Sequence, residues 1–148
     1  MTAPKVILKS VIVAASPEHA FALWIDRIDS WWPKSHSISK DPGTTIILEG
    51  HVGGRFFERT STGRENDFGS VTLFNPPQRL AYDWYLGTDR TRPTEVDVTF
   101  AAEGDGTRVT VEHRGADLVG NVWFERCSGF NQAWEAVLPC YTSFVKGN

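Results

Sequence analysis

The fold is decided by residues 121–146, which read NVWFERCSGFNQAWEAVLPCYTSFVK. Apolar side chains recur along this stretch at the spacing of one helical face: Trp123, Cys127, Phe130, Trp134, Val137, Leu138, Tyr141 and Val145. Such a long aromatic face has to be covered by another apolar surface. The stretch therefore predicts a long C-terminal helix, with Asn121 as its N-cap and Gly147 after its end, packed against a sheet.

The chain before this helix contains a series of candidate strands. Alternating or β-branched stretches lie at 5–14, 44–49, 55–59, 68–74, 78–86, 94–102 and 107–114. Glycine-containing turns separate several of them, most clearly the EGDG turn at 103–106. After the first strand, SPE at 16–18 is typical of a helix start, and a second short helical piece ends with WWP at 31–33. This order of strand, two helices, six strands and a long helix predicts one α+β domain.

Composition and charge exclude several classes of function. Hydrophobic residues make up 41% and charged residues 22% of the 148, and the net charge is −3; with no basic run, we expect no nucleic-acid partner. The chain has no run of about 18 apolar residues, so we expect no membrane span. Lys5 and Lys9 interrupt the first apolar run, so we expect no signal peptide. Cys127 and Cys140 are too far apart on the predicted helix for a disulfide, which favours a cytoplasmic protein.

Five short motifs occur along the chain. They are SPEHAFALW at 16–24, GGRF at 53–56, PPQRL at 76–80, GTRVTVEH at 106–113 and GF at 129–130, the last followed by Trp134 and Leu138. In this order the chain resembles the START-like, or SRPBCC, superfamily, and within it the homologues of the heat-shock-protein-90 ATPase activator. The resemblance covers nearly the whole chain. It implies one domain over residues 1–148 with the helix-grip fold, in which a curved antiparallel sheet of six or seven strands wraps around the C-terminal helix and two short helices follow the first strand.

The resemblance leaves three functions open, because this fold supports several. It implies a hydrophobic cavity between the sheet and the final helix, so our leading hypothesis is a domain that binds an apolar, aromatic or lipid-like small molecule. That hypothesis predicts a cavity of roughly 300–1,000 Å³. The second hypothesis is a stress-response protein that contacts a chaperone through its surface. The third, which we favour least, is a cyclase- or dehydratase-like enzyme, and we expect a monomer or a homodimer.

Aromatic and aliphatic residues of the helices and of the dry strand faces are the candidates for the cavity lining. They are Trp24, Trp32, Phe56, Trp84, Val98, Val111, His113, Phe130, Trp134, Leu138 and Tyr141. The alternative for each of them is ordinary core packing. The pair Trp31-Trp32 is a candidate for the cavity mouth, or alternatively for an exposed patch that binds a partner protein.

Three polar residues are the candidates for acid–base catalysis: Glu58, Tyr82 and His113. If Glu58 shares a strand face with Phe56, burial would raise the pKa of its carboxyl group, as in a general acid or base. A slip of one residue in the strand register would instead put Glu58 in water. His113 shares a predicted dry face with two valines and is either a hydrogen-bonded core residue or a polar anchor in the cavity.

The sequence indicates neither a metal site nor a cofactor. The histidines His19, His36, His51 and His113 are scattered, and no cysteine–histidine cluster has the spacing of metal ligands.

Pro139 falls inside the predicted C-terminal helix, where proline removes one backbone hydrogen bond and clashes with the preceding turn. We therefore expect a kink near 135–139, which either fits the helix to the curved sheet or shapes the cavity.

Overall fold

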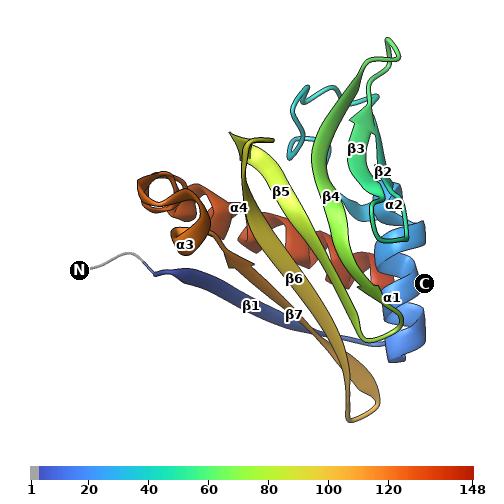
Figure 1. The fold of residues 1–148 in the computed structure, drawn as a ribbon. Coiled ribbons are helices and arrows are strands. Elements are labelled where there is room, and N and C mark those ends of the chain that lie inside the picture. The colour runs from blue at the N-terminus through green and yellow to red at the C-terminus, as the bar shows by residue number, and fades with distance from the viewer. Residues whose placement is uncertain (1–3) are drawn as a thin grey trace.

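The structure, a computed structural model, describes residues 4–148 and confirms the α+β class (Figure 1). The strands are β1 (Val6–Val13), β2 (Thr45–Leu48), β3 (Arg55–Arg59), β4 (Glu65–Asn75), β5 (Arg79–Asp89), β6 (Arg92–Glu103) and β7 (Gly106–Arg114). The helices are α1 (Pro17–Asp26), α2 (Ile28–Trp31), α3 (Ala116–Val119) and α4 (Asn121–Lys146). The chain thus has the predicted helix-grip architecture, with α3 as an additional short helix that the sequence did not predict.

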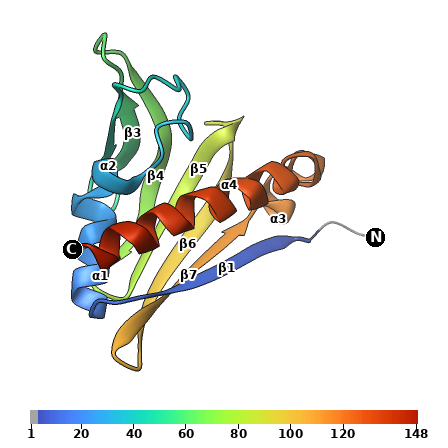
Figure 2. The same ribbon diagram turned by 180° about the vertical axis from the view of Figure 1, so that it is seen from behind.

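The strands form one antiparallel sheet in the order β1-β7-β6-β5-β4-β3-β2. The sheet is curved, and α4 lies across its concave side with α1 and α2 near one end of it (Figure 2). Strands β2 to β7 follow one another along the chain, whereas β1 joins beside β7 at the opposite edge. Because α1 and α2 lie between β1 and β2 in the sequence, they connect the two edges and share the concave side with α4.

Alternation along the strands puts the apolar side chains on the concave face. In the middle of the sheet Tyr82 lies opposite Val96, and Val96 lies opposite His113. The buried residues that share this face in β5, β6 and β7 are Leu80, Tyr82, Trp84, Thr94, Val96, Val98, Phe100, Thr107, Val109, Val111 and His113. The register therefore confirms the dry faces that the sequence pattern predicted for these strands.

Two hydrogen bonds from aromatic side chains of α4 reach the elements around it. Tyr141 donates from its hydroxyl to the carbonyl oxygen of Ala20 in α1 at 2.6 Å. Trp134 donates from Nε1 to Nδ1 of His113 in β7 at 3.0 Å. Since the two bonds lie two turns apart on the helix and point to different elements, together they restrict both the rotation and the sliding of α4 on the sheet.

Trp31 and Trp32 are buried, with 4% and 3% of their surfaces exposed. Trp31 donates from Nε1 to the carbonyl oxygen of Leu23 at 3.2 Å. Its ring packs against those of Trp24 and Tyr141, with centroid distances of 4.8 and 4.9 Å. The alternative that the tryptophan pair forms an exposed patch is therefore wrong, because both rings are buried, with Trp31 packed between α1 and α4.

The beginning of α4 differs from the prediction. Its N-cap is Gly120, and Asn121 is the first helical residue. Gly120 has φ of +61°, a conformation that glycine adopts without strain, and this residue separates α3 from α4. The helix then runs through Pro139 to Lys146 without interruption. The kink near 135–139 stays a prediction.

Ion pairs between polar residues join β3 to β4. Arg59 of β3 pairs with Glu65 of β4, and Arg55 pairs with Asp67, each at 2.8 Å. Cross-strand pairs of opposite charge stabilise a ladder much as apolar pairs do. This explains why β4 begins at Glu65, earlier than the apolar alternation predicted.

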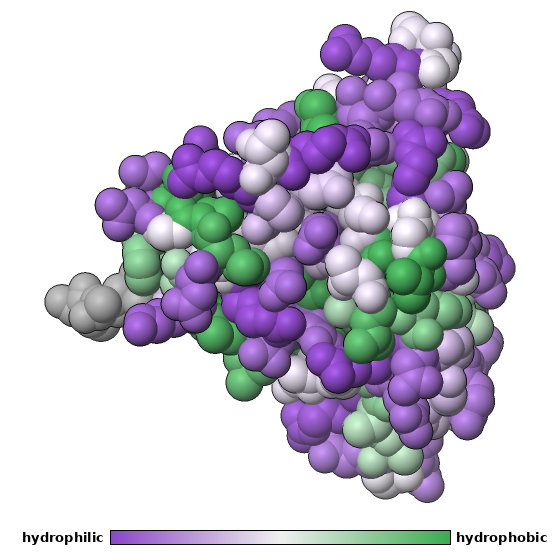
Figure 3. All heavy atoms as spheres, in the orientation of Figure 1, coloured by the Kyte–Doolittle hydropathy of each residue, from purple (hydrophilic) through white to green (hydrophobic). Residues whose placement is uncertain are grey.

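The convex face of the sheet carries mainly polar side chains (Figure 3). Asp97 of β6 lies between Arg79 of β5 and Arg114 of β7, with N–O distances of 2.5 and 3.7 Å. The two faces of the sheet therefore differ in polarity. Most of the apolar side chains of the strands lie on the concave face, on the side of α4.

We expect Tyr141→Phe to lower the free energy of unfolding by about 1–2 kcal/mol, because the substitution removes the bond between α4 and α1. The measurement is urea denaturation followed by tryptophan fluorescence. Tyr85→Phe, at a partly buried tyrosine of β5, is the matched control and should change stability by less than about 0.5 kcal/mol. Equal effects of the two substitutions would contradict the role given to the Tyr141 hydroxyl.

Candidate functional site

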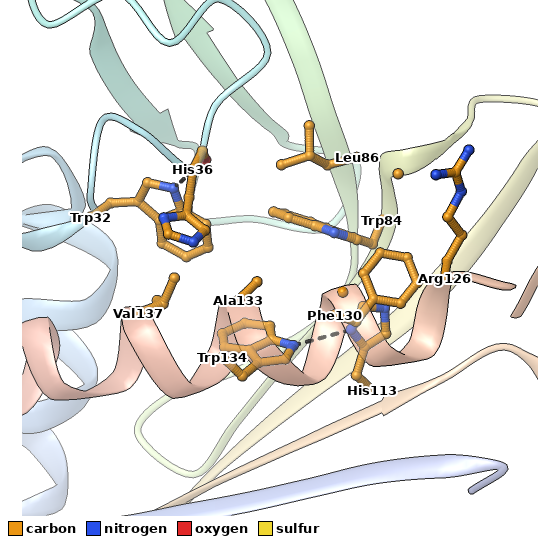
Figure 4. A pocket seen from close by; sticks show the side chains of 12 residues that line it. Trp32, His36, Trp84, Leu86, His113, Arg126, Phe130, Ala133, Trp134 and Val137 are labelled. Atoms are coloured by element: carbon orange, nitrogen blue, oxygen red, sulfur yellow. Dashed lines mark hydrogen bonds between the residues drawn. The ribbon is translucent and has the colours of Figure 1, made fainter. Parts of the chain in front are cut away.

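A pocket of about 250 Å³ lies between β5, α4 and the segment that follows α2 (Figure 4). Its lining residues are Trp32, His36, Trp84, Leu86, Gly87, His113, Arg126, Gly129, Phe130, Ala133, Trp134 and Val137. The volume falls slightly below the predicted range of roughly 300–1,000 Å³ for ligand pockets. The pocket therefore suits a small ligand.

The floor of the pocket is one stripe of α4. Arg126, Gly129, Ala133 and Val137 follow one another at intervals of three or four residues, the spacing of one helical face. A Cβ atom added at Gly129 would meet nothing within 4 Å. Small residues at two successive positions of the stripe thus leave open space above the helix, between the neighbouring aromatic rings.

The second wall comes from the end of β5. Trp84 and Leu86 face the helix, and Gly87 lies against the ring of Phe130. A Cβ atom at Gly87 would lie 2.7 Å from Cε1 of Phe130, and φ of Gly87 is +90°. Only glycine allows the strand to approach the ring this closely in this conformation.

The third wall comes from Trp32 and His36. Trp32 donates from Nε1 to the carbonyl oxygen of His36 at 2.9 Å. Its ring also packs against Trp84 and Trp134, with centroid distances of 5.9 and 6.2 Å. Burial, and next the charge of Lys40, lowers the pKa of His36 below its usual value, so its imidazole is neutral at neutral pH.

His113 lies at the back of the pocket with no exposed surface. An indole N–H can only donate, so Nδ1 of His113 accepts the bond from Trp134 and the proton of the neutral ring is on Nε2. Nε2–H then donates to Oγ1 of Thr94 at 2.8 Å. Burial, and next the charge of Arg114, lowers the pKa of His113 to about 3. Both ring nitrogens are therefore used in hydrogen bonds. His113 lines the pocket, but neither nitrogen is free to act as a base.

Glu58 is buried at the edge of the sheet, outside the pocket. It accepts bonds from the backbone N–H groups of Ile38 and Ser39 at 3.1 and 2.9 Å. It also accepts from the Ser39 and Thr44 hydroxyls and from the Asn66 amide, at 2.5, 2.8 and 3.1 Å. Burial raises the pKa of the Glu58 carboxyl group, but these hydrogen bonds outweigh it, and the net pKa lies below the usual value. The sequence-based expectation of a raised pKa is wrong, because it could not include these donors.

Tyr82 has no exposed surface, and its hydroxyl has no hydrogen-bond partner within residues 4–148. Burial raises its pKa, so the hydroxyl stays protonated. Its ring packs against Phe56 and Trp84 at centroid distances of 5.3 and 5.7 Å. Of the three catalytic candidates, only His113 reaches the pocket, and the three do not converge on a common point.

A family model described as activator of Hsp90 ATPase homolog 1-like protein matches residues 14–139. The chain belongs to this family. A search of curated proteins gave no match.

Several solved structures are similar to this activator-family chain. A structure described as an anthrahydroquino-γ-pyrone synthase, Txn09, complexed with SUM is 34% identical, with 81% of this chain and 83% of that chain covered and a TM-score of 0.56. The Aha1 dimer from Colwellia psychrerythraea is 18% identical, with 95% and 96% covered and a TM-score of 0.69. Protein NE0264 from Nitrosomonas europaea is 14% identical, with 99% and 97% covered and a TM-score of 0.69. The last two likenesses show the fold alone.

The structure separates the predicted lining residues of this activator-family chain into two groups. Trp32, Trp84, His113, Phe130 and Trp134 line the pocket. Trp24, Phe56, Val98, Val111, Leu138 and Tyr141 are buried in the core and do not line it. Both groups come from the same dry faces, so the amphipathic pattern alone does not distinguish them.

The sequence analysis missed His36, Leu86, Gly87, Arg126, Gly129, Ala133 and Val137 as lining residues. One signal was present for the helix. Gly129 and Ala133 lie beside Phe130 and Trp134 in the sequence, and two small residues at a helical spacing of four indicate space along a face. No such signal exists for His36, which lies in an irregular segment.

Within residues 4–148, no group of three or more histidine, cysteine, aspartate or glutamate side chains is placed to hold a metal ion. None of the helices in the same range is long and apolar enough to cross a membrane. Cys127 is buried on α4, as expected for a small core residue, and Cys140 is exposed.

We expect Glu58→Gln to lower the free energy of unfolding at neutral pH by about 2–4 kcal/mol, because a glutamine NH₂ group cannot accept from the donors around it. Glu103→Gln, in an exposed ion pair with Arg108, is the control and should cost less than about 1 kcal/mol.

The pH dependence of this difference follows from the lowered pKa of Glu58. The stabilisation is fully present above the pKa of the unfolded carboxyl group and is lost as the pH falls through the lower folded value. The difference between wild type and Glu58→Gln should therefore shrink in acid, as measured by urea denaturation across pH. A difference that stays constant would contradict an ionised Glu58.

His113 should make the fold sensitive to mild acid. The unfolded chain binds a proton at this residue near pH 6.5, whereas the folded chain binds it only near pH 3. The free energy of unfolding should therefore fall as the pH drops below 6.5, by about 1.4 kcal/mol per pH unit from this group. In His113→Gln that part of the slope should disappear, whereas His51→Gln, at an exposed turn, should keep the wild-type slope.

Proposed function

We propose that the chain binds a small planar aromatic molecule in the pocket between β5 and α4. The observation that carries this proposal is the set of four aromatic side chains, Trp32, Trp84, Phe130 and Trp134, that line the pocket from three separate elements. Rings that surround a space from several sides provide offset-stacked and edge-on contacts to a flat ligand.

The chemistry of the pocket supports a binding function more than a catalytic one. Its polar groups are few, as in ligand sites where a small number of polar contacts fixes the orientation. His113 uses both of its ring nitrogens for hydrogen bonds inside the protein. Small residues at Gly129 and Ala133 keep the space open.

The test is the fluorescence of N-phenylnaphthylamine, a neutral aromatic probe, titrated with the purified protein. We expect saturable binding by the wild type. Ala133→Phe should fill the pocket and weaken binding by about tenfold or more. Ala136→Phe places the same side chain at an exposed position of the same helix and should leave binding unchanged.

Two outcomes would overturn the proposal. One is the absence of saturable binding by the wild type. The other is equal binding by the wild type and Ala133→Phe, which would place the probe outside the pocket. Thermal denaturation of each variant shows whether a loss of binding comes from a loss of folding.

A second candidate is ring formation on an aromatic substrate in the same pocket, favoured by the 34% identity to the γ-pyrone synthase. Neutral His36 is the lining group that would act as the base in place of Glu58 and Tyr82. Incubation with an ortho-hydroxyaryl β-diketone, which closes to a γ-pyrone with the loss of one water, tests this candidate. Product formation faster than in buffer and dependent on His36 would support it, and a rate equal to that in buffer would remove it.

The family name and the dimeric relative keep two further expectations open. One is contact with a chaperone and the other is a homodimer. Burial of Trp31 and Trp32 removes the surface that the sequence offered for a chaperone. A cytoplasmic location likewise stays an expectation.

A further inference from the structure

One formal charge lies in the lining of the pocket. Arg126 is the only lysine, arginine, aspartate or glutamate among the lining residues. His36 and His113 also line the pocket, and both have pKa values below the usual value of a histidine. At neutral pH the lining of the pocket therefore carries a single positive charge.

Among the residues that the structure describes, Arg126 has no carboxylate partner for this charge. On the sheet, by contrast, Arg55 and Arg79 each form an ion pair with a carboxylate of a neighbouring strand. No ion pair or hydrogen bond joins the guanidinium group of Arg126 to another side chain within residues 4–148. Glu125, its neighbour in the chain, points about 100° away around the helix axis.

Arg126 is exposed and lies at one end of the pocket. It begins the α4 stripe that continues through Gly129 and Ala133. Figure 4 shows its side chain rising from α4 on the side of Phe130 and Leu86, at the opposite end of the pocket from His36. Gly129, the next residue of the stripe, has no side chain, and the ring of Phe130 lies between Arg126 and the tryptophan rings, so the guanidinium group marks the open end of the space between the rings.

We propose that the ligand of this pocket is an aromatic acid, whose ring lies among the tryptophans while its anionic oxygens pair with Arg126. This inference rests on the proposed function and adds the charge of the ligand to it. A guanidinium group presents parallel N–H donors that match the two oxygens of a carboxylate. A purely apolar ligand would leave that donor set unused at the edge of the bound molecule.

The experiment compares two probes of similar size and shape, naphthoate and the neutral acetonaphthone, by isothermal titration calorimetry at low salt. The wild type should bind naphthoate about tenfold more tightly than acetonaphthone. Arg126→Gln should remove that preference and change the affinity for acetonaphthone by less than about twofold. Added salt should weaken the binding of naphthoate to the wild type, because salt screens an ion pair near the surface.

Arg64→Gln is the matched control. Arg64 is an exposed arginine between β3 and β4, distant in the sequence from the pocket elements and not among the lining residues. Arg64→Gln changes the net charge by the same amount as Arg126→Gln, so a preference for naphthoate that depends on overall charge would fall equally in both variants. We expect the preference to survive in Arg64→Gln.

The outcomes separate this inference from the proposed function. If the wild type binds acetonaphthone and shows no preference for naphthoate, or if Arg126→Gln keeps that preference, the assignment of an acidic ligand paired with Arg126 is wrong. The proposal of a pocket for an aromatic molecule then stands. If neither probe binds the wild type, the proposed function itself fails. If both arginine variants lose the preference equally, the effect is one of net charge and the assignment to Arg126 is overturned.

Discussion

The structure depends on a single constraint: one helix has to cover the concave face of a seven-stranded sheet. Near its C-terminal end, α4 meets α1, and the Tyr141 hydroxyl joins them through Ala20. Further toward its N-terminus the helix forms the floor of the pocket, which includes Gly129 and Ala133. The same helix therefore supplies both core residues and the floor of the pocket.

Two buried polar groups join strands of the sheet to the segments packed against them. His113 joins β7 to α4 through Trp134 and to β6 through Thr94. Glu58 joins β3 to the irregular segment around Ser39. Each is fully hydrogen-bonded, which is the condition under which a buried polar group stabilises a fold. Their perturbed pKa values thus have structural causes, although perturbed values often mark catalytic groups as well.

The sequence predicted the sheet and the helix because both depend on local periodicity, as in the alternation around Val96, Val98 and Phe100. It could not predict the roles of Glu58 and His113, because their partners come from distant parts of the chain: Ser39 for one and Trp134 for the other. The pocket was predicted only in part. Core and lining residues share one face, and what distinguishes them is the absence of side chains at positions such as Gly129, together with a segment around His36 that has no periodicity.

The open position at Gly129 has a consequence for how proteins of this kind diversify. A Cβ atom added there would meet nothing within 4 Å. Substitutions at Gly129 and Ala133 can therefore alter the shape of the pocket at little cost to folding, whereas changes at Tyr141 or Trp134 would disturb the attachment of the helix. If the pocket binds a ligand as proposed, a few changes on one helical stripe would alter which ligand it takes, with the supporting sheet unchanged.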